Sequence, residues 1–246
     1  VWAWKENRVK QMKKHIDRLM VILPFEKEFF AKRGMKVDFV GHPLIDEVEA
    51  RKIKSEIQKE NVIALLPGSR KQEINHILPV MLQLQQVFPD HQFIIGKAPS
   101  MDLSFYQKGF DLGKAEISID GTSHLLARSK AALVASGTAT LETALLNVPQ
   151  VVCYKASSIS VMIARQLIKV PYISLVNLIL DKAAVKELIQ DEMTVENISS
   201  ELKLLLESNK RKAQMEADYR MLWTLLGAGG ASERAAALIV GDMRNQ

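Results

Sequence analysis

The segment that most clearly suggests a binding site is a run of small residues that ends in a carboxylate. Residues 135–142 read Ala-Ser-Gly-Thr-Ala-Thr-Leu-Glu, follow the apolar run Ala131–Ala135 and open a helical pattern. Free amides in the first turn of a helix form an anion site together with the helix dipole, and glycine lets the backbone approach a ligand. Glu142 lies one turn into that helix, where its carboxylate can accept hydrogen bonds from ribose hydroxyls.

The pattern therefore indicates a phosphate loop, although a capped strand–helix turn with Glu142 in solvent gives the same pattern. The candidate binding residues in this loop are Ser136, Gly137, Thr138, Ala139, Thr140 and Glu142.

A second loop of this kind comes earlier in the chain. Residues 66–70 read Leu-Pro-Gly-Ser-Arg and again connect an apolar run to a helical pattern. Gly68 permits a tight turn, Ser69 can donate to a phosphate, and the forked guanidinium of Arg70 can hold phosphate oxygens. Taken alone, this loop is equally compatible with a capped turn and a surface arginine. Doubly wound sheets bind ligands at the carboxyl ends of their strands, so the two loops together predict a nucleoside diphosphate site.

Other polar residues give weaker signals. His42, between Gly41 and Pro43, suits either a ligand contact in an interdomain crevice or a role in stabilising a hinge. Asn177 is a polar residue just past Tyr172–Leu175, an apolar run that we expect to be a strand. The remaining histidines show no metal-ligand spacing, and no two aspartates form a D-x-D pair. We therefore expect neither a metal site nor a cofactor.

The elements that must position these loops alternate along the chain. Six apolar runs are predicted as strands: Val62–Leu66, Gln92–Ile95, Glu116–Ile119, Ala131–Ala135, Gln150–Tyr154 and Tyr172–Leu175. Helical patterns separate most of them: Gln72–Val87, Leu103–Gly109, Thr122–Arg128, Thr138–Leu146 and Ile159–Ile168. Strands that are apolar throughout and alternate with helices predict an α/β fold with a Rossmann-like, doubly wound parallel sheet. Residues 184–240 are expected to be helical.

The residues before this series form a shorter α/β pattern. A basic amphipathic helix is predicted over Lys5–Arg18, a second helix over Phe25–Arg33, and strands over Leu19–Leu23 and Val37–Val40. We expect this segment to be too short for a sheet of its own. The predicted organisation is a remnant of an N-terminal domain (1–45), a linker (46–60), a Rossmann-like domain (61–220) and a C-terminal helical segment (221–246).

Composition limits the partners. The chain has 246 residues, 48% of them hydrophobic, with a net charge of +5 and a pI near 9.2. This small net positive charge suits phosphate-bearing ligands or an anionic membrane surface, and it is lower than the charge expected of a nucleic-acid-binding protein. No apolar run approaches the roughly 20 residues that span a bilayer, and the first residues show no charged-then-apolar pattern, so we expect no signal peptide. The lone Cys153 lies in an apolar run and is expected to be a buried hydrophobe.

Five motifs in this order resemble the lipid-A-disaccharide synthase family, over nearly the whole chain. They are Val1–Trp4, Phe39–Leu44, Leu66–Arg70, Ala135–Glu142 and Pro171–Leu178. The resemblance implies a glycosyltransferase of the B architecture, in which two Rossmann-like domains face a cleft. It implies transfer of 2,3-diacylglucosamine from UDP-2,3-diacylglucosamine to 2,3-diacylglucosamine 1-phosphate, with inversion and release of UDP, in lipid A biosynthesis. The enzyme would be peripheral on the cytoplasmic face of the bacterial inner membrane.

The resemblance also implies roles for residues. The Gly137–Thr140 loop and Arg70 would hold the pyrophosphate, Glu142 the ribose, and Asn177 would line the donor site. Two departures stand out. The family's N-terminal region, with the aspartate that serves as general base, has no counterpart here, so no catalytic residue is assigned and we expect this chain to lack most of that domain. Where relatives carry an Ala-Gly-Arg-Glu-like stretch, this chain has Leu-Asp-Lys-Ala at residues 180–183.

Two alternatives stay open at this point. One is another UDP-sugar enzyme of the same architecture, such as an epimerase or a glycosyltransferase of peptidoglycan precursors. The other is a UDP-binding fragment without catalytic activity. The basic helix Lys5–Arg18 favours a peripheral membrane enzyme, although a solvated basic face has the same pattern.

Overall fold

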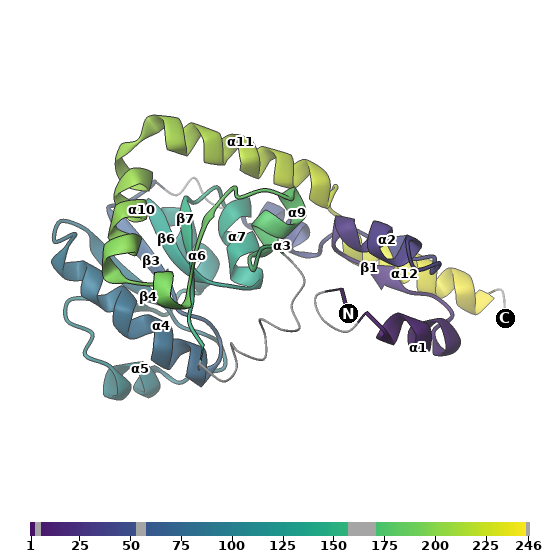
Figure 1. Cartoon of the computed structure of the whole chain (residues 1–246), viewed down its shortest axis with the longest axis horizontal. Helices are drawn as coiled ribbons and strands as arrows, with labels where there is room; N and C mark the ends of the chain where they lie inside the picture. Colours follow the sequence, from purple (N-terminus) through teal and green to yellow (C-terminus); the bar gives the residue numbers. More distant parts are fainter. Residues whose placement is uncertain (3–5, 53–57, 157–170, 245–246) are drawn as a thin grey trace. The chain divides into compact units, whose positions relative to one another are not determined.

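The computed structural model describes residues 1–2, 6–52, 58–156 and 171–244 (Figure 1). Its contacts divide the chain into two compact units. In the described residues, the larger unit comprises 58–156 and 171–219, and the smaller unit comprises 1–2, 6–52 and 220–244.

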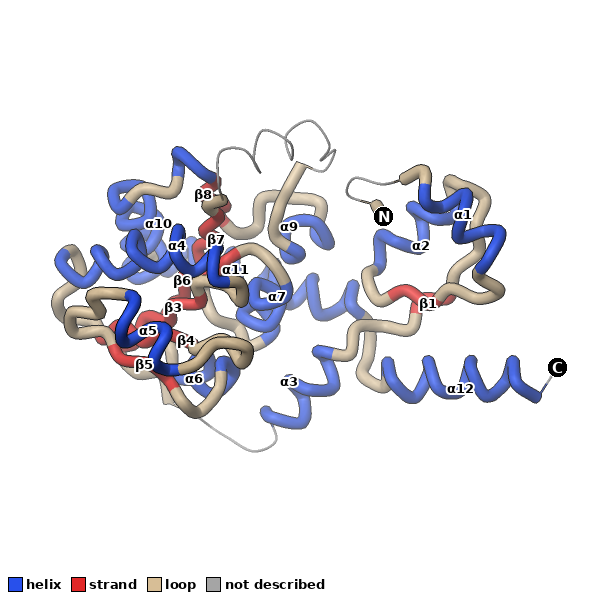
Figure 2. The backbone as a smooth tube through the Cα atoms, turned by 90° about the horizontal axis from the view of Figure 1, so that it is seen from below, coloured by secondary structure: helices blue, strands red, loops and turns tan. Residues whose placement is uncertain are grey.

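The larger unit is built on a six-stranded parallel sheet, counted over the described residues, with the order β5-β4-β3-β6-β7-β8. Its strands are β3 (Val62–Leu66), β4 (Gln92–Gly96), β5 (Glu116–Ser118), β6 (Ala131–Ala135), β7 (Gln150–Tyr154) and β8 (Lys186–Ile189). Figure 2 shows the strands following one another in this order. Numbered within the unit, the order is 3-2-1-4-5-6, which is that of a Rossmann fold. The predicted doubly wound sheet is therefore confirmed.

Helices cover both faces of this sheet, which explains why its central strands are apolar throughout. Leu125 and Leu126 of α6 (Thr122–Arg128) pack with Val62, Ala64 and Leu66 of β3. The alternate residues of β3 are equally buried and face the other way. In Figure 2, α4 (Lys71–Gln83) and α10 (Val195–Glu207) lie on one side of the strands, with α6 and α7 (Thr138–Leu145) on the other.

The remaining elements of this unit are short. They are η1 (Leu84–Gln86), α5 (Leu103–Gly109), α9 (Leu175–Leu180) and η2 (Gln190–Glu192), and α11 (Asn209–Leu226) leads out of it. Cys153 on β7 is fully buried, and burial raises its pKa to about 12, so the prediction of a buried hydrophobe is confirmed.

Two predictions for this unit are wrong. Tyr172–Leu175 is not a strand: bends lead to Ser174, whose hydroxyl caps α9 by accepting a hydrogen bond from the Asn177 amide. The sixth strand is instead β8, within the region expected to be helical, where Glu187 pairs with Val152 of β7. Its sequence, Lys-Glu-Leu-Ile, lacks the continuous apolar run of the inner strands because β8 is an edge strand. The predicted helix Ile159–Ile168 lies outside the described residues.

The smaller unit contains α1 (Arg8–His15), β1 (Met20–Val21), α2 (Pro24–Ala31), β2 (Asp38–Phe39), α3 (Leu44–Lys52) and α12 (Ala231–Arg244). Strands β1 and β2 pair in parallel, so the expectation that this segment makes no sheet of its own is wrong. Its core consists of Val9, Val21, Phe30, Met35 and Val37. The strands are short, and the packing of α1 and α2 on them supplies the apolar core that two strands alone lack.

Polar contacts join α12 to the N-terminal residues of this unit. The Asp46 carboxylate accepts hydrogen bonds from the Gly230 and Ala231 amides, at 2.5 and 3.3 Å. The Arg234 guanidinium donates to the Val40 carbonyl at 2.9 Å. Asp46 thus supplies both a cap and a negative charge at the amino end of α12, where the helix dipole favours an anion.

We therefore expect Asp46→Ala to destabilise the chain by about 1–2 kcal/mol, because two helix amides lose their acceptor. Thermal unfolding followed by circular dichroism would show a lower midpoint for the variant. Asp17→Ala, at an exposed position outside any helix, is the matched control. Equal midpoints for Asp46→Ala and the wild type would contradict the capping role.

Candidate functional site

The two loops singled out in the sequence leave neighbouring strands at the point where the strand order reverses. β3 and β6 are paired, with Leu66 opposite Val134, so the residues that follow them emerge side by side at the carboxyl edge of the sheet. Both loops turn at glycines with positive φ, +110° at Gly68 and +136° at Gly137, which L side chains rarely adopt. The sequence therefore located both loops correctly at the switch point.

The first loop presents an exposed cation. The side chain of Arg70 is 79% exposed, and its Nη1 donates to Oε1 of Glu73 at 2.9 Å. Glu73 also lies over Gly68, where a Cβ would come within 2.8 Å of its Oε2. The exposed side chain of Ser69 lies beside Arg70, and its carbonyl accepts a hydrogen bond from Ser100. Glu73 thus packs against the turn while most of the guanidinium fork faces solvent.

The second loop, at Gly137, offers backbone groups to a ligand and no charged side chain. Helix α7 begins at Thr138, directly after Gly137, and apart from the chain neighbours of Gly137 no atom of the described residues lies within 4 Å of the position that its Cβ would occupy. The Thr140 hydroxyl donates to the Gly137 carbonyl at 2.7 Å, and the Ser136 hydroxyl donates to the Ile173 carbonyl at 2.8 Å. These two predicted residues therefore hold the loop in shape. Gly137, the exposed Thr138 and the half-buried Ala139 form the accessible start of the helix.

Glu142 lies one turn into α7, as the sequence predicted, and it is half-buried. Its Oε1 accepts a hydrogen bond from the hydroxyl of Ser123 on α6. The contact brings the segment after β5 to the same part of the sheet edge and orients the carboxylate. Sequence reasoning missed Ser123, because a serine in the first turn of a helix has no distinguishing local pattern.

Asn177 and His42 are both buried. Asn177 is 1% exposed, its Nδ2 donates to the Val185 carbonyl and to Glu187, and its Oδ1 accepts from the Val185 amide. The structure therefore places its amide in an internal network and not at the surface. In the smaller unit, the Nδ1 of His42 accepts a hydrogen bond from the Leu44 amide, and burial lowers the pKa of the imidazole.

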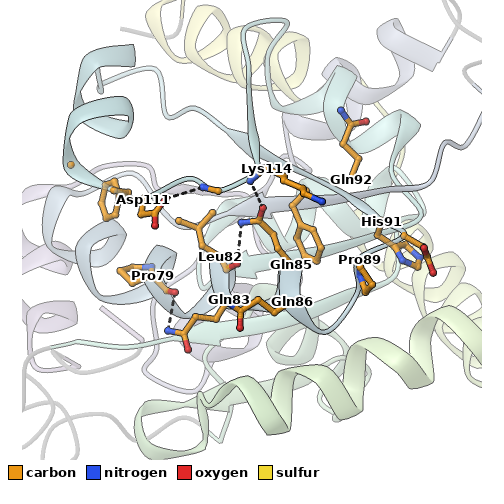
Figure 3. A pocket seen from close by; sticks show the side chains of 15 residues that line it. Pro79, Leu82, Gln83, Gln85, Gln86, Pro89, His91, Gln92, Asp111 and Lys114 are labelled. Carbon is orange, nitrogen blue, oxygen red and sulfur yellow. Dashed lines mark hydrogen bonds between the residues drawn. The ribbon is translucent and has the colours of Figure 1, made fainter.

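A cavity lies elsewhere in the larger unit. It measures about 920 Å³ and is lined by residues at the opposite edge of the sheet, including Gln92, the first residue of β4, and Lys114, just before β5 (Figure 3). Gln85 spans it by donating to the Leu82 and Leu112 carbonyls and accepting from the Lys114 amide. This cavity is remote in the fold from the two glycine loops. Among the described residues, no cluster of histidine, cysteine and carboxylate side chains is arranged to hold a metal ion.

The strand order and the two glycine loops define the larger unit as a Rossmann-like α/β unit, and both loops lie at the carboxyl edge of its sheet, where folds of this class bind ligands. The likeness to solved structures agrees with this class. A UDP-N-acetylglucosamine 2-epimerase from Neisseria meningitidis, solved with UDP-GlcNAc, superimposes with a TM-score of 0.59 at 16% identity, over 91% of this chain and 61% of that one. The calicheamicin glycosyltransferase CalG4 gives 0.57 at 17% identity, over 94% and 55%.

The chain belongs to the lipid-A-disaccharide synthetase family, whose model matches residues 1–239. It is 38% identical over 254 residues to the lipid-A-disaccharide synthase of Syntrophus aciditrophicus, and 37% identical over 259 residues to that of Nitrosococcus oceani. The matches cover 97% and 98% of this chain but 66% and 67% of the relatives. The resemblance seen in the sequence is therefore confirmed, for a chain that spans about 66% of the length of the Syntrophus relative.

Arg70 provides the first test of the site. We expect Arg70→Ala to weaken UDP binding by about 1.5–3 kcal/mol, because the variant loses a charge-assisted hydrogen bond to phosphate. Isothermal titration calorimetry measures this difference, and Lys203→Ala, which removes an exposed cation from α10, is the control. Equal UDP affinities for Arg70→Ala and the wild type would exclude Arg70 from the site.

Proposed function

We propose that this chain carries the donor-binding part of a lipid-A-disaccharide synthase. The reaction is the inverting transfer of 2,3-diacylglucosamine from UDP-2,3-diacylglucosamine to 2,3-diacylglucosamine 1-phosphate. The observation that carries the proposal is the presence of both glycine loops at the switch point, in a chain that belongs to this family.

The proposed site supplies positive charge where the reaction needs it. Negative charge builds on the UDP leaving group as the bond to the anomeric carbon breaks. The free amides at the start of α7 and the exposed guanidinium of Arg70 would stabilise that charge. The loop before α7 is held in shape before the reaction by Ser136 and Thr140, and one nitrogen of the Arg70 guanidinium donates to Glu73. A ligand that develops charge here meets donors that need little reorganisation.

Glu142 would bind the ribose. Its carboxylate is half-buried, is oriented by Ser123, and lies one turn from the start of α7. A nucleoside diphosphate with its phosphates over Gly137 would place the ribose hydroxyls toward the same face of the helix. Asn177 would affect the donor site only indirectly, because its side chain is hydrogen-bonded to the Val185 backbone inside the protein.

A lipid surface is the proposed location of both acylated substrates. Helix α1 exposes Arg8, Lys10, Lys13 and Lys14 and buries Val9. Exposed cations on an amphipathic helix attract anionic lipid headgroups, by about 1 kcal/mol for each charge near the surface. In the described part of the chain, no helix has the length and hydropathy to cross a membrane.

We expect Glu142→Ala to lose affinity for UDP by about tenfold and to bind inorganic pyrophosphate as the wild type does, because only UDP carries the ribose hydroxyls. Titration with both ligands separates ribose recognition from helix stability. Ser123→Ala should show a smaller loss of the same kind, since it removes only the group that orients the carboxylate. Equal losses for UDP and pyrophosphate would contradict ribose binding by Glu142.

The activity itself is tested by disaccharide formation from the two acylated substrates. We expect these 246 residues to bind UDP, and to transfer the sugar only when joined to polypeptide that corresponds to the rest of the relatives' length. General-base assistance contributes about 10²–10⁴ in rate, and Glu142, the carboxylate among the proposed donor-site residues, is assigned to the ribose and not to the acceptor hydroxyl. Equal turnover by the 246 residues and by the extended protein would contradict this expectation, and epimerisation of UDP-N-acetylglucosamine would contradict the proposed reaction.

A further inference from the structure

Glu187 on β8 is the centre of a hydrogen-bond network that the proposed reaction does not use directly. Within the described residues, its Oε2 accepts from the Ile173 amide at 3.0 Å. Its Oε1 accepts from the Ser174 amide at 3.0 Å, the Ser174 hydroxyl at 2.7 Å and Nδ2 of Asn177 at 2.8 Å. One carboxylate thus binds four donors from a loop and a short helix that precede it in the chain.

These donors belong to a segment with little regular structure of its own. Ile173 and Ser174 lie in the bends before α9, which is only six residues long. Ser174 is fully buried, and its hydroxyl also accepts from the Asn177 amide at 3.3 Å. Asn177 in turn binds both the amide and the carbonyl of Val185. Because Ile173 and Ser174 lie before the helix and in no strand, the Glu187 carboxylate supplies the acceptor that their amides need.

The same segment contacts the proposed diphosphate loop. The Ile173 carbonyl accepts the hydroxyl hydrogen bond of Ser136 at 2.8 Å, while the Ile173 amide donates to Glu187. Ile173 is therefore held from both sides, by the edge strand β8 and by the residue that immediately precedes Gly137. A shift of Ile173 would release Ser136 and, with it, the turn that exposes the first amides of α7.

We propose that Glu187 is a positioning residue for the Ser136–Gly137 loop and acts on the ligand's phosphates through Ile173. The inference rests on the proposed UDP site. Replacing the carboxylate by an amide leaves one oxygen for four donors and turns an NH₂ group toward the others. The segment then has to rearrange, because a donor that faces another donor is left unsatisfied.

The experiment is a double-mutant cycle with two ligands. Isothermal titration is run with UDP and with uridine on the wild type, Glu187→Gln, Ser136→Ala and the double variant. We expect Glu187→Gln to weaken UDP binding by about tenfold and to leave uridine binding nearly unchanged, because uridine lacks the phosphates. Ser136→Ala should weaken UDP binding in the same selective way, and the double variant should bind UDP about as well as the weaker single variant.

Three results would overturn the proposal: wild-type UDP affinity in Glu187→Gln, additive losses in the double variant, or equal losses for UDP and uridine, which would indicate general loosening of the fold. Glu207→Gln, at an exposed position at the end of α10, is the matched control and should bind as the wild type. Failure of the wild type to bind UDP would instead refute the proposed function.

Ser174→Ala keeps the test open if Glu187→Gln does not fold. The variant removes one donor to the carboxylate and leaves the charge in place. We expect a smaller loss of UDP affinity, about threefold, again without a change for uridine. Unchanged UDP affinity in a folded Ser174→Ala variant would overturn the proposal as well.

Discussion

The adjacency of β3 and β6 is the constraint on which the larger unit depends. The two strands are separated along the chain by β4 and β5, yet Leu66 pairs with Val134. The strand order extends from β3 in one direction and from β6 in the other, so the connecting helices diverge and the two glycine loops lie between them. Both strands lie between helix layers, which is why every residue in them is buried and apolar.

The loop at Gly137 is held on one side by half-buried polar groups and on the other by a buried one. On one side, Ser136 donates to Ile173, whose amide is fixed by Glu187. On the other, Nε2 of the fully buried Gln150 on β7 donates to the Thr140 carbonyl at 2.9 Å. Tyr219 of α11 accepts a further hydrogen bond from Gln150, and its burial raises the pKa of the phenol. Buried polar networks of this kind fix geometry more than they add stability, and a preorganised anion site depends on such fixed geometry.

The fold and the family membership support different parts of the proposed function. Likeness to an epimerase and to a glycosyltransferase, at 16% and 17% identity, shows the architecture that these proteins share. Proteins of one architecture catalyse different reactions with residues on their loops, so the architecture does not identify the reaction of this chain. Membership in the lipid-A-disaccharide synthetase family, shown by a match over residues 1–239, is what favours the proposed transfer reaction over the other reactions of this architecture. The two glycine loops are what this chain's own residues would contribute to such a reaction.

Local patterns in the sequence determined the central strands and both glycine loops. The predicted bounds of Val62–Leu66, Ala131–Ala135 and Gln150–Tyr154 are those of β3, β6 and β7, because apolar runs bounded by turn residues are complete within a few positions. The positive φ values at Gly68 and Gly137 fit the same local signals. The resemblance to the family likewise rested on short contiguous motifs.

Tertiary structure alone decided the surroundings of those loops. The edge strand β8 has a polar sequence, and only its pairing with β7 makes it a strand. Tyr172–Leu175 is apolar like a strand but instead leads into α9, and Glu187, 14 and 13 residues further along the chain, binds the amides of Ile173 and Ser174. The buried side chain of Asn177 donates a hydrogen bond to the same carboxylate. Hydrogen bonds between residues distant in sequence leave no periodic pattern, so they become visible only when the fold brings their partners together.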